Sequence, residues 1–121
     1  MTSRTTALTG RRVLLVEDDY FIANAMRGQF EENGAQVLGP VPSVRSALAL
    51  IAATPEIDAA VLDINLQEEW VFPVADALRA RGVSFVFATG YDRGVIPLRF
   101  GDVGHYEKPV EAAQIATALF G

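Results

Sequence analysis

Five polar side chains stand directly after short apolar runs in this 121-residue chain. They are Glu17, Asp18, Asp63, Thr89 and Lys108. Carboxylate oxygens are the ligands that a hard cation such as Mg²⁺ prefers, and a carboxylate can also accept a phosphoryl group covalently. A hydroxyl and an ammonium group are suited to bind phosphoryl oxygens. The residue types therefore indicate magnesium-assisted phosphoryl transfer, provided that the fold brings the ends of these runs together.

The apolar runs alternate with segments of helical periodicity, which is typical of strands joined by crossover helices. We expect strands at residues 13–16, 36–39, 59–63, 84–89 and 105–107. This alternation predicts an α/β, doubly wound, five-stranded parallel sheet of the flavodoxin-like type, with strand order 2-1-3-4-5. The carboxyl ends of parallel strands share one edge of the sheet, so the five polar side chains are predicted to converge there.

Four regular helices are expected, at residues 20–33, after Ser43, at 71–81 and at 111–120. A loop with two prolines leads from the second strand to the helix after Ser43, and the Ser43 side chain is suited to act as its N-cap. The apolar spacing in this helix predicts that Val44, Leu48 and Ile51 face the core.

The composition bounds the class of protein. Half of the residues are hydrophobic, which is enough to fill the core of one domain; we place that domain at residues 11–121, behind a flexible tail of residues 1–10. The net charge of −5 disfavours direct binding to nucleic acid. The absence of cysteine and the presence of one histidine, His105, exclude thiolate and multi-histidine metal sites. No apolar stretch approaches the roughly 20 residues that span a membrane, so we expect a cytoplasmic protein.

Each candidate side chain also has an ordinary structural interpretation. A lone aspartate at a strand end commonly caps a loop, and Asp19 can cap the helix that follows it. Glu17 and Asp18 would repel each other unless a cation lies between them. Asp63 ends a buried apolar run and is the best candidate for a nucleophile. The predicted convergence of these groups favours the chemical interpretation over the structural one.

The order of an acidic pair, an aspartate, a threonine and a Lys-Pro pair, each at a predicted strand end, resembles the receiver domain of two-component response regulators. The resemblance covers residues 12–121, and it implies a receiver fold. It further implies that Asp63 accepts a phosphoryl group from the phosphohistidine of a sensor histidine kinase or from a phosphotransfer protein. The domain would not be an enzyme in the usual sense, although it would phosphorylate itself from small donors and dephosphorylate itself.

The same resemblance assigns roles to the other groups. The Mg²⁺ ligands would be Glu17, Asp18, Asp63 and the backbone carbonyl of Asn65, with Glu17 acting through water. Thr89 and Lys108 would bind the phosphoryl oxygens and drive a conformational switch. The partner surface would comprise the segment after Thr89 together with residues 105–107 and 111–120, and the helix at residues 20–33 would dock the kinase.

Residues 87–91 read Phe-Ala-Thr-Gly-Tyr and resemble the Phe-Ala-Thr-Gly motif of a receiver subgroup from alphaproteobacteria. Members of that subgroup are often paired with kinases of the HWE type, and several act in general stress signalling. They can lack a regular fourth helix, which agrees with Gly94 and Pro97, because both residues oppose helix formation between residues 91 and 100. Tyr91 is at a position where its bulk could screen an acyl phosphate from water.

The chain departs from the common receiver pattern in two places. The usual Pro-Gly pair after the phosphoacceptor is replaced by residues 65–70, so this loop should differ in shape, and Trp70 in it is expected to pack over the third helix. His105 stands where a switch aromatic is usual, next to Tyr106. A rotating-aromatic mechanism is therefore not implied here, and His105 can equally be an ordinary strand histidine.

Two competing functions each require a residue or motif that the sequence lacks. A phosphohydrolase with an aspartyl-phosphate intermediate needs a second aspartate two positions after the nucleophile, where this chain has Asn65. A flavin- or nucleotide-binding module needs a glycine-rich loop after the first strand, which is absent. The resemblance to a receiver is therefore preferred, and because that resemblance takes up residues 12–121 we expect a stand-alone receiver that binds a partner when phosphorylated or relays the phosphoryl group. The alternative is a phosphorylation-independent protein-interaction module with a relic acidic pocket.

Overall fold

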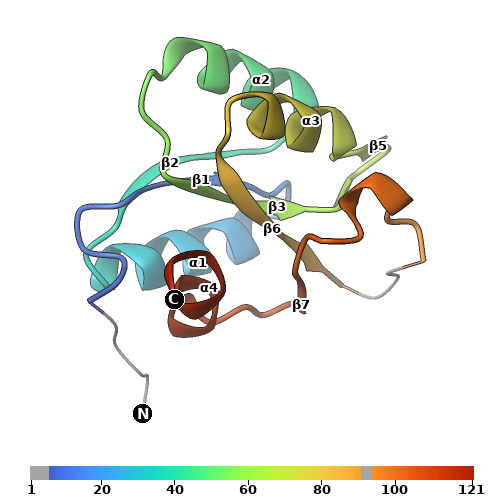
Figure 1. Cartoon of the computed structure of the whole chain (residues 1–121). Coiled ribbons are helices and arrows are strands. Elements are labelled where there is room, and N and C mark those ends of the chain that lie inside the picture. Colours follow the sequence, from blue (N-terminus) through green and yellow to red (C-terminus); the bar gives the residue numbers. More distant parts are fainter. Residues whose placement is uncertain (1–5, 91–93) are drawn as a thin grey trace.

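The computed structural model describes residues 6–90 and 94–121. Its main sheet has five parallel strands in the order β2-β1-β3-β6-β7. They are β1 (Arg12–Val16), β2 (Gln36–Val41), β3 (Ala59–Asp63), β6 (Ser84–Thr89) and β7 (His105–Glu107). The expected doubly wound parallel sheet and its strand order are confirmed (Figure 1).

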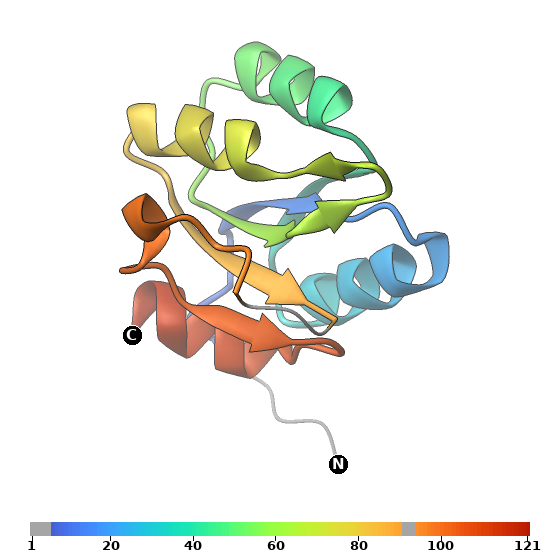
Figure 2. The ribbon, with the colours of Figure 1, turned by 90° about the vertical axis from the view of Figure 1, so that its right-hand side faces the viewer.

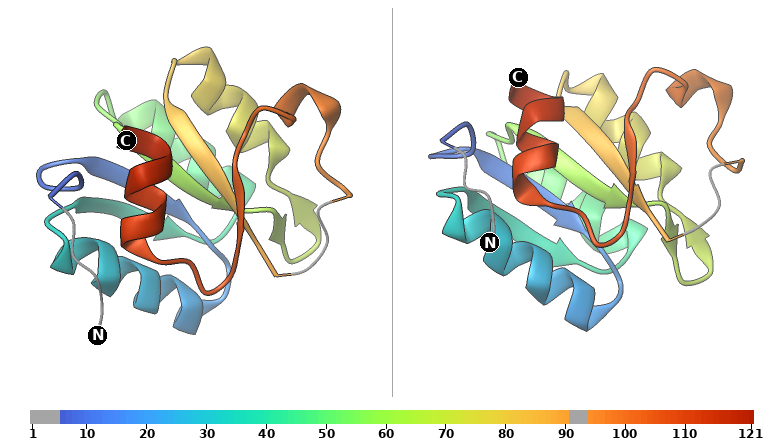
Figure 3. Two further views of the ribbon diagram at one scale, coloured as in Figure 1. Left: turned by 60° about the horizontal axis from the view of Figure 1, so that its bottom comes forward. Right: turned by 90° about the horizontal axis from the view of Figure 1, so that it is seen from below.

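Helices cover both faces of the sheet, which gives three layers (Figure 2). The helices α2 (Val44–Ala53) and α3 (Phe72–Ala80) lie on one face. The helices α1 (Tyr20–Glu32) and α4 (Ala112–Phe120) lie side by side on the other face, as the view from below shows (Figure 3). Within the described ranges, no helix combines the length and the apolar character needed to cross a membrane.

The alternation of side chains along β1 explains why both faces need a cover. Val13 and Leu15 pack with α1 and α4, whereas Leu14 and Val16 pack with α2 and α3, and all four are fully buried. Burying one such side chain contributes about 1.5–3 kcal/mol. A strand that is apolar on both faces is typical of the interior of a parallel sheet with both faces covered, and β1 is such an interior strand, between β2 and β3.

The cap of α2 is confirmed, but one of its predicted core residues is wrong. The Ser43 hydroxyl accepts a hydrogen bond from the Ser46 N–H, in a reciprocal capping arrangement with the Ser46 side chain. The buried stripe of the helix consists of Ala47 and Ile51, whereas Leu48 is exposed. Ala47 and Ile51 are four positions apart and so share one helical face, while Leu48 is turned away from it.

The second strand is longer than expected. It was predicted to end at Gly39 in a proline-containing loop, yet β2 continues through Pro40 to Val41. β2 is an edge strand, where a residue without an N–H group is tolerated. The register against β1 shifts in this region, and Gly39 has a φ of 90°. A Cβ there would lie 2.8 Å from the Val41 nitrogen, so this bend requires glycine.

In the segment between β6 and β7, the described residues 94–104 contain one short 3₁₀-helix, η1 (Leu98–Phe100). This agrees with the expectation of a short or irregular element. Phe100 is buried, and its ring packs on three others, Phe72, Phe85 and Phe87, at centroid distances of 5.7–6.0 Å. The segment is therefore positioned by the packing of Phe100 in the core, with Val95, Ile96 and Val103 partly buried against the same cluster, rather than by a regular helix.

Two arginine–aspartate pairs also fasten this segment to α3. Arg79 donates two hydrogen bonds to Asp102, at 3.0 and 3.1 Å, and a third to the Arg99 carbonyl. The Arg99 side chain in turn makes a two-point contact with Asp76 of α3. These pairs are exposed, so screening by solvent keeps their contribution to stability small. They mainly orient the segment that Phe100 anchors.

The N-terminus of α4 is capped from another helix. Its own N-cap residue, Glu111, makes no side-chain cap hydrogen bond. The side-chain carbonyl of Gln29, on α1, accepts the hydrogen bond of the Ala112 N–H instead. A free N–H group of the first helical turn is thereby satisfied, and α1 and α4 are joined by a polar contact beside their apolar one.

Leu8 lies in the stretch that we expected to be a flexible tail, but its side chain is fully buried. It packs in the same cluster as Val13, Met26 and Phe30. Backbone hydrogen bonds hold this turn; among them, the Gly10 N–H donates to the Gly34 carbonyl, and the Arg11 N–H donates to the Leu8 carbonyl. A single leucine among polar residues carried no periodic signal that could place it in the core.

We predict that Leu8→Ala lowers the free energy of unfolding by about 2–5 kcal/mol, because it removes buried methyl groups and leaves a cavity. Urea unfolding followed by circular dichroism measures this. The matched control is Leu98→Ala, because Leu98 is 98% exposed and its truncation should change stability by about 0.5 kcal/mol or less. Equal midpoints for the two variants would show that Leu8 is not packed in solution.

Candidate functional site

The carboxyl ends of the strands bring every predicted site residue to one cavity of about 550 Å³. Its polar lining includes Glu17, Asp18, Asp63, Asn65, Thr89 and Lys108. These residues come from the ends of β1, β3, β6 and β7 and from the residues that follow them. The predicted convergence is therefore observed, and its cause is the shared direction of the parallel strands.

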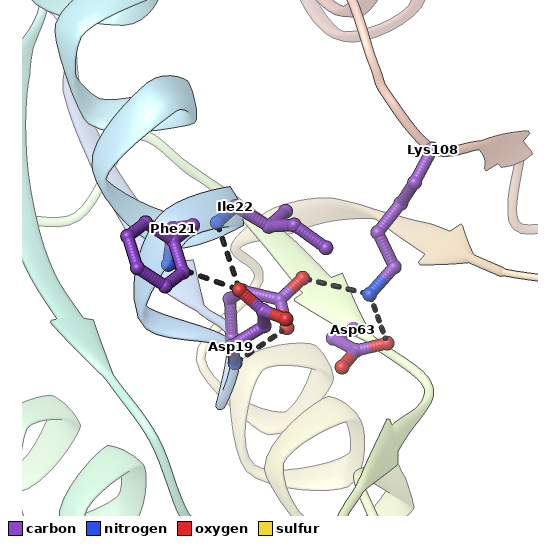
Figure 4. A network of polar contacts seen from close by, with 6 residues as sticks. Asp19, Phe21, Ile22, Asp63 and Lys108 are labelled. Carbon is purple, nitrogen blue, oxygen red and sulfur yellow. Dashed lines mark hydrogen bonds and ion pairs between the residues drawn. The ribbon is translucent and has the colours of Figure 1, made fainter.

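The ammonium group of Lys108 lies between two carboxylates (Figure 4). Its Nζ atom is 2.8 Å from Glu17 Oε1 and 3.1 Å from Asp63 Oδ1. The backbone N–H of Lys108 donates to the Thr89 carbonyl at 3.0 Å, which continues the pairing of β7 with β6 up to the site. The backbone thus holds the lysine at the same edge as the two acidic strand ends.

The acidic residues after β1 have separate structural partners. The second carboxylate oxygen of Glu17 accepts a hydrogen bond from the Asp19 N–H at 3.1 Å. The Asp19 side chain accepts hydrogen bonds from the N–H groups of Phe21 and Ile22, at 2.9 and 3.0 Å (Figure 4). Asp19 is therefore the N-cap of α1, as expected, whereas the half-buried Asp18 interacts with the Asp63 side chain.

Three carboxylates are close enough to share one cation. One oxygen from each of Glu17, Asp18 and Asp63 lies within 4.8 Å of the others. Mg²⁺ prefers such oxygen donors and completes its coordination with waters and carbonyl oxygens. Asn65 lines the same cavity, so its carbonyl is in the right region to join them. The donor set fits Mg²⁺ by its chemistry.

Burial, followed by the charge of Glu17, raises the pKa of Asp63 from 3.8 to about 8. Lys108 acts in the opposite direction, but the two effects outweigh it. Burial also acts to lower the pKa of Lys108, yet its hydrogen bond to Glu17 and the charge of Asp63 raise that pKa above its usual value. The lysine is therefore charged. Its single positive charge is not enough to keep all the carboxyl groups of the cluster ionised without a further cation.

No protein-family model and no curated protein sequence matches the chain. Solved structures do match. SdrG from Sphingomonas melonis Fr1 is 40% identical over 95% of this chain and 96% of that chain, with a TM-score of 0.78. A response regulator receiver domain (CheY-like) from Methylobacillus flagellatus has the same fold, at 24% identity over 88% of this chain and 93% of that chain, with a TM-score of 0.75. The chain belongs to the response regulator receiver domain family.

A second solved structure of SdrG extends this likeness. The BeF3-activated conformation of SdrG from Pseudomonas melonis Fr1 is 39% identical over 95% of this chain and 96% of that chain, with a TM-score of 0.74. The present receiver domain therefore resembles SdrG in both solved states. Receiver domains are signalling modules of two-component systems rather than enzymes in the usual sense.

The structure describes His105, which stands at the usual position of a switch aromatic, whereas Tyr91, which we expected to screen the acyl phosphate from water, lies outside the described residues. His105 is in β7, as expected, opposite Phe87 in the sheet. Its Nδ1 atom is buried and makes no hydrogen bond with the described part of the chain. The strand position of His105 is thus confirmed, and its role in switching stays untested.

A short hairpin next to the site was not predicted. β4 (Asn65–Leu66) and β5 (Glu69–Trp70) pair in antiparallel fashion, with Asn65 opposite Trp70. The hairpin is consistent with the expectation that the loop after Asp63 differs in shape from that of most receivers. The turn residue Gln67 has a φ of 60°, which glycine or asparagine would normally signal. Without such a residue the sequence contained no recognisable hairpin pattern.

Trp70 lines the same cavity as the acidic cluster. Its ring stacks on Phe72 at the start of α3, with centroids 6.2 Å apart and an interplanar angle of 21°. This contact confirms that Trp70 packs over the third helix. The sequence placed it near the site but gave no reason to regard it as part of the cavity wall.

We predict that Asp63→Asn stabilises the metal-free receiver domain at pH 8. Since the folded-state pKa of Asp63 is raised, its contribution to stability is complete below pH 4 and is lost as the pH rises towards about 8. The asparagine variant avoids that loss. Its gain in unfolding free energy should be on the order of 1 kcal/mol or more at pH 8, because one pKa unit corresponds to about 1.4 kcal/mol.

Urea unfolding in EDTA at pH 5 and pH 8 measures this difference. The gain over wild type should be larger at pH 8 than at pH 5. Asp58→Asn is the control, because it changes an aspartate outside the cavity. Its effect on unfolding should not grow between pH 5 and pH 8 as that of Asp63→Asn does. A gain for Asp63→Asn that is independent of pH would contradict the raised pKa.

Proposed function

We propose that this receiver domain accepts a phosphoryl group on Asp63 and signals in the phosphorylated form. The observation that carries the proposal is the contact of Lys108 with Asp63 inside a cavity that also holds the Glu17 and Asp18 carboxylates. This combination supplies a nucleophile, a cation for the phosphoryl oxygens and the donors for a metal ion.

In the proposed reaction, one Asp63 carboxylate oxygen attacks the phosphorus atom of a phosphohistidine. A new O–P bond forms, the P–N bond to the imidazole breaks, and the imidazole leaves with the electron pair of that bond and takes up a proton. The product is an acyl phosphate on Asp63. The attacking group must be ionised, so the raised pKa of Asp63 means that a positive charge in the cavity promotes the reaction.

We assign the ligands of Mg²⁺ to Asp18, Asp63, the backbone carbonyl of Asn65 and, through water, Glu17. The ion would supply positive charge that offsets the repulsion between the carboxylate and the incoming phosphoryl oxygens. Asp18 is well placed for this role, because it is not engaged by Lys108 as Glu17 and Asp63 are.

Lys108 and Thr89 are proposed to bind the phosphoryl oxygens. The Lys108 ammonium already contacts the nucleophile, so a phosphoryl group on Asp63 could take its place as the partner of that charge. Thr89 is buried at the end of β6 and lines the cavity, and its hydroxyl is suited to donate to a phosphoryl oxygen. Both residues join the phosphoryl group to β6, to β7 and to the segment between them.

The proposed phosphodonor is a sensor histidine kinase or a phosphotransfer protein. Family membership supports this class of partner, and the Phe-Ala-Thr-Gly motif at residues 87–90 supports a kinase of the HWE type and a role in stress signalling. The output would be phosphorylation-dependent binding of a protein partner or relay of the phosphoryl group. We propose that the domain acts in the cytoplasm, where such kinases present their phosphohistidine.

Acetyl phosphate tests the proposal directly. Incubation with acetyl phosphate and Mg²⁺ should add one phosphoryl group to wild type, as seen by intact-protein mass spectrometry. The adduct should be absent in Asp63→Ala and in EDTA. Folded wild-type protein that gains no mass from acetyl phosphate, or from a kinase of the HWE type, would instead favour a phosphorylation-independent interaction module with a relic acidic pocket.

We further predict that Asp18→Asn raises the Mg²⁺ concentration needed for half-maximal phosphorylation by about tenfold or more, because a direct carboxylate ligand is lost. The same mass measurement, made over a series of Mg²⁺ concentrations, gives this value. Glu68→Gln is the matched control: it removes an exposed acidic group from the turn of the nearby hairpin without touching the cavity lining. Similar Mg²⁺ requirements for both variants would refute the assignment of Asp18.

A further inference from the structure

The cavity around Asp63 is lined by both polar and apolar side chains. The apolar side chains that line it include Ile22 from α1, Trp70 from β5 and Val95 from the segment after β6. Trp70 is the largest of these, and it is 49% exposed. A single half-exposed aromatic side chain is ordinary on a protein surface, but this one lines the charged cavity and so contributes apolar surface to its wall.

The position of Trp70 is strongly constrained. It pairs across the hairpin with Asn65, two residues after Asp63, so the hairpin places the indole beside the strand end that carries the nucleophile. Its ring is backed by Phe72, which in turn stacks on Phe100 at 5.9 Å and 22°.

Two further contacts hold the hairpin itself. Leu66 is buried in the core, and the Glu69 carboxylate accepts a hydrogen bond from the Val44 N–H at the start of α2, at 3.2 Å. The indole is therefore a rigid part of the cavity wall rather than a loosely attached surface group.

A rigid apolar group at this position affects how water occupies the cavity. Hydrolysis of an acyl phosphate requires a water oxygen to attack phosphorus: the new O–P bond forms, the bond between phosphorus and the Asp63 oxygen breaks, and the carboxylate and inorganic phosphate are released with the water proton. The attacking water must enter through the mouth of the cavity. Apolar surface at that mouth reduces the number of waters held near the phosphorus atom.

We propose that Trp70 shields the acyl phosphate from water and thereby sets the lifetime of the phosphorylated state. This inference rests on the proposed phosphorylation of Asp63 and adds a residue that determines how long the signal lasts. Trp70 acts through the shape and polarity of the cavity wall, so it affects loss of the phosphoryl group more than its arrival. It is a positioning residue for water rather than a catalytic residue.

The test measures the decay of the phosphorylated protein. Wild type, Trp70→Ala and Trp70→Phe are phosphorylated with acetyl phosphate and Mg²⁺ and freed of the donor, and the mass of the adduct is followed with time. Trp70→Ala should lose its phosphoryl group on the order of tenfold faster, which corresponds to about 1.4 kcal/mol of barrier. Trp70→Phe retains a ring that can stack on Phe72, so its decay should be close to that of wild type.

Leu98→Ala is the matched control, because it truncates another exposed apolar side chain that does not line this cavity. Equal decay rates for wild type and Trp70→Ala would overturn the inference while leaving phosphorylation of Asp63 intact. Failure of wild type to gain the adduct would overturn both. If Trp70→Ala does not fold, Trp70→Gln, which keeps a long side chain but is polar, should also show the faster decay.

A purely structural role for Trp70 would give a different result. If the indole only held the hairpin in place, Trp70→Ala would require more Mg²⁺ for phosphorylation, because Asn65 would shift. We expect an unchanged Mg²⁺ requirement together with faster decay, and a raised requirement with unchanged decay would overturn the inference.

A spectroscopic readout requires no phosphoryl transfer. Trp70 is the only tryptophan in the chain, so its fluorescence reports on the cavity wall. Titration with Mg²⁺ alone should change the emission of wild type, and Asp18→Asn should move that change to higher concentrations. Emission that does not respond to Mg²⁺ would contradict the placement of the indole against the site.

Discussion

A single ammonium group lies between two buried carboxylates, and the rest of the site depends on this contact. Glu17 and Asp63 are each less than 5% exposed, and one buried carboxylate without a partner would cost several kcal/mol. Lys108 reaches them from a position 91 residues after Glu17. The ammonium can do so only if β1, β3 and β7 end at the same edge, so the ion pairs and the sheet order require each other.

The sequence was informative wherever a local pattern decides the structure. Apolar runs followed by polar residues predicted the strand ends, and from these the meeting of Asp63 with Lys108, because a parallel sheet leaves one edge for such ends. It was uninformative where contacts distant in sequence decide. Leu8 is buried by residues of β1 and α1, so nothing in its own stretch of sequence indicated its packing. The turn at Gln67 lacks glycine, so the sequence around it gave no sign of a hairpin.

The segment between β6 and β7 has a sequence that disfavours a regular helix, yet packing fixes the position of its described residues. Its backbone forms little regular structure, yet Phe100 enters an aromatic cluster that also contains Phe72. Phe72 contacts Trp70, which lines the acidic cavity. One column of rings therefore joins the candidate site to the surface that carries η1. The exposed arginine–aspartate pairs orient that surface and add little to stability.

The cap that Gln29 gives to α4 makes the last helix of the domain dependent on the first. The N-cap residue of α4 makes no side-chain cap hydrogen bond, so an N–H group of its first turn needs an acceptor on another helix. Such a helix cannot replace the corresponding helix of a related chain unless that chain provides a suitable acceptor. Substitutions at position 29 and at the start of α4 should therefore be linked during divergence. In a chimaera that joins the C-terminal part of this domain to the body of a relative, the residue facing Ala112 would decide whether the new helix begins at the same place.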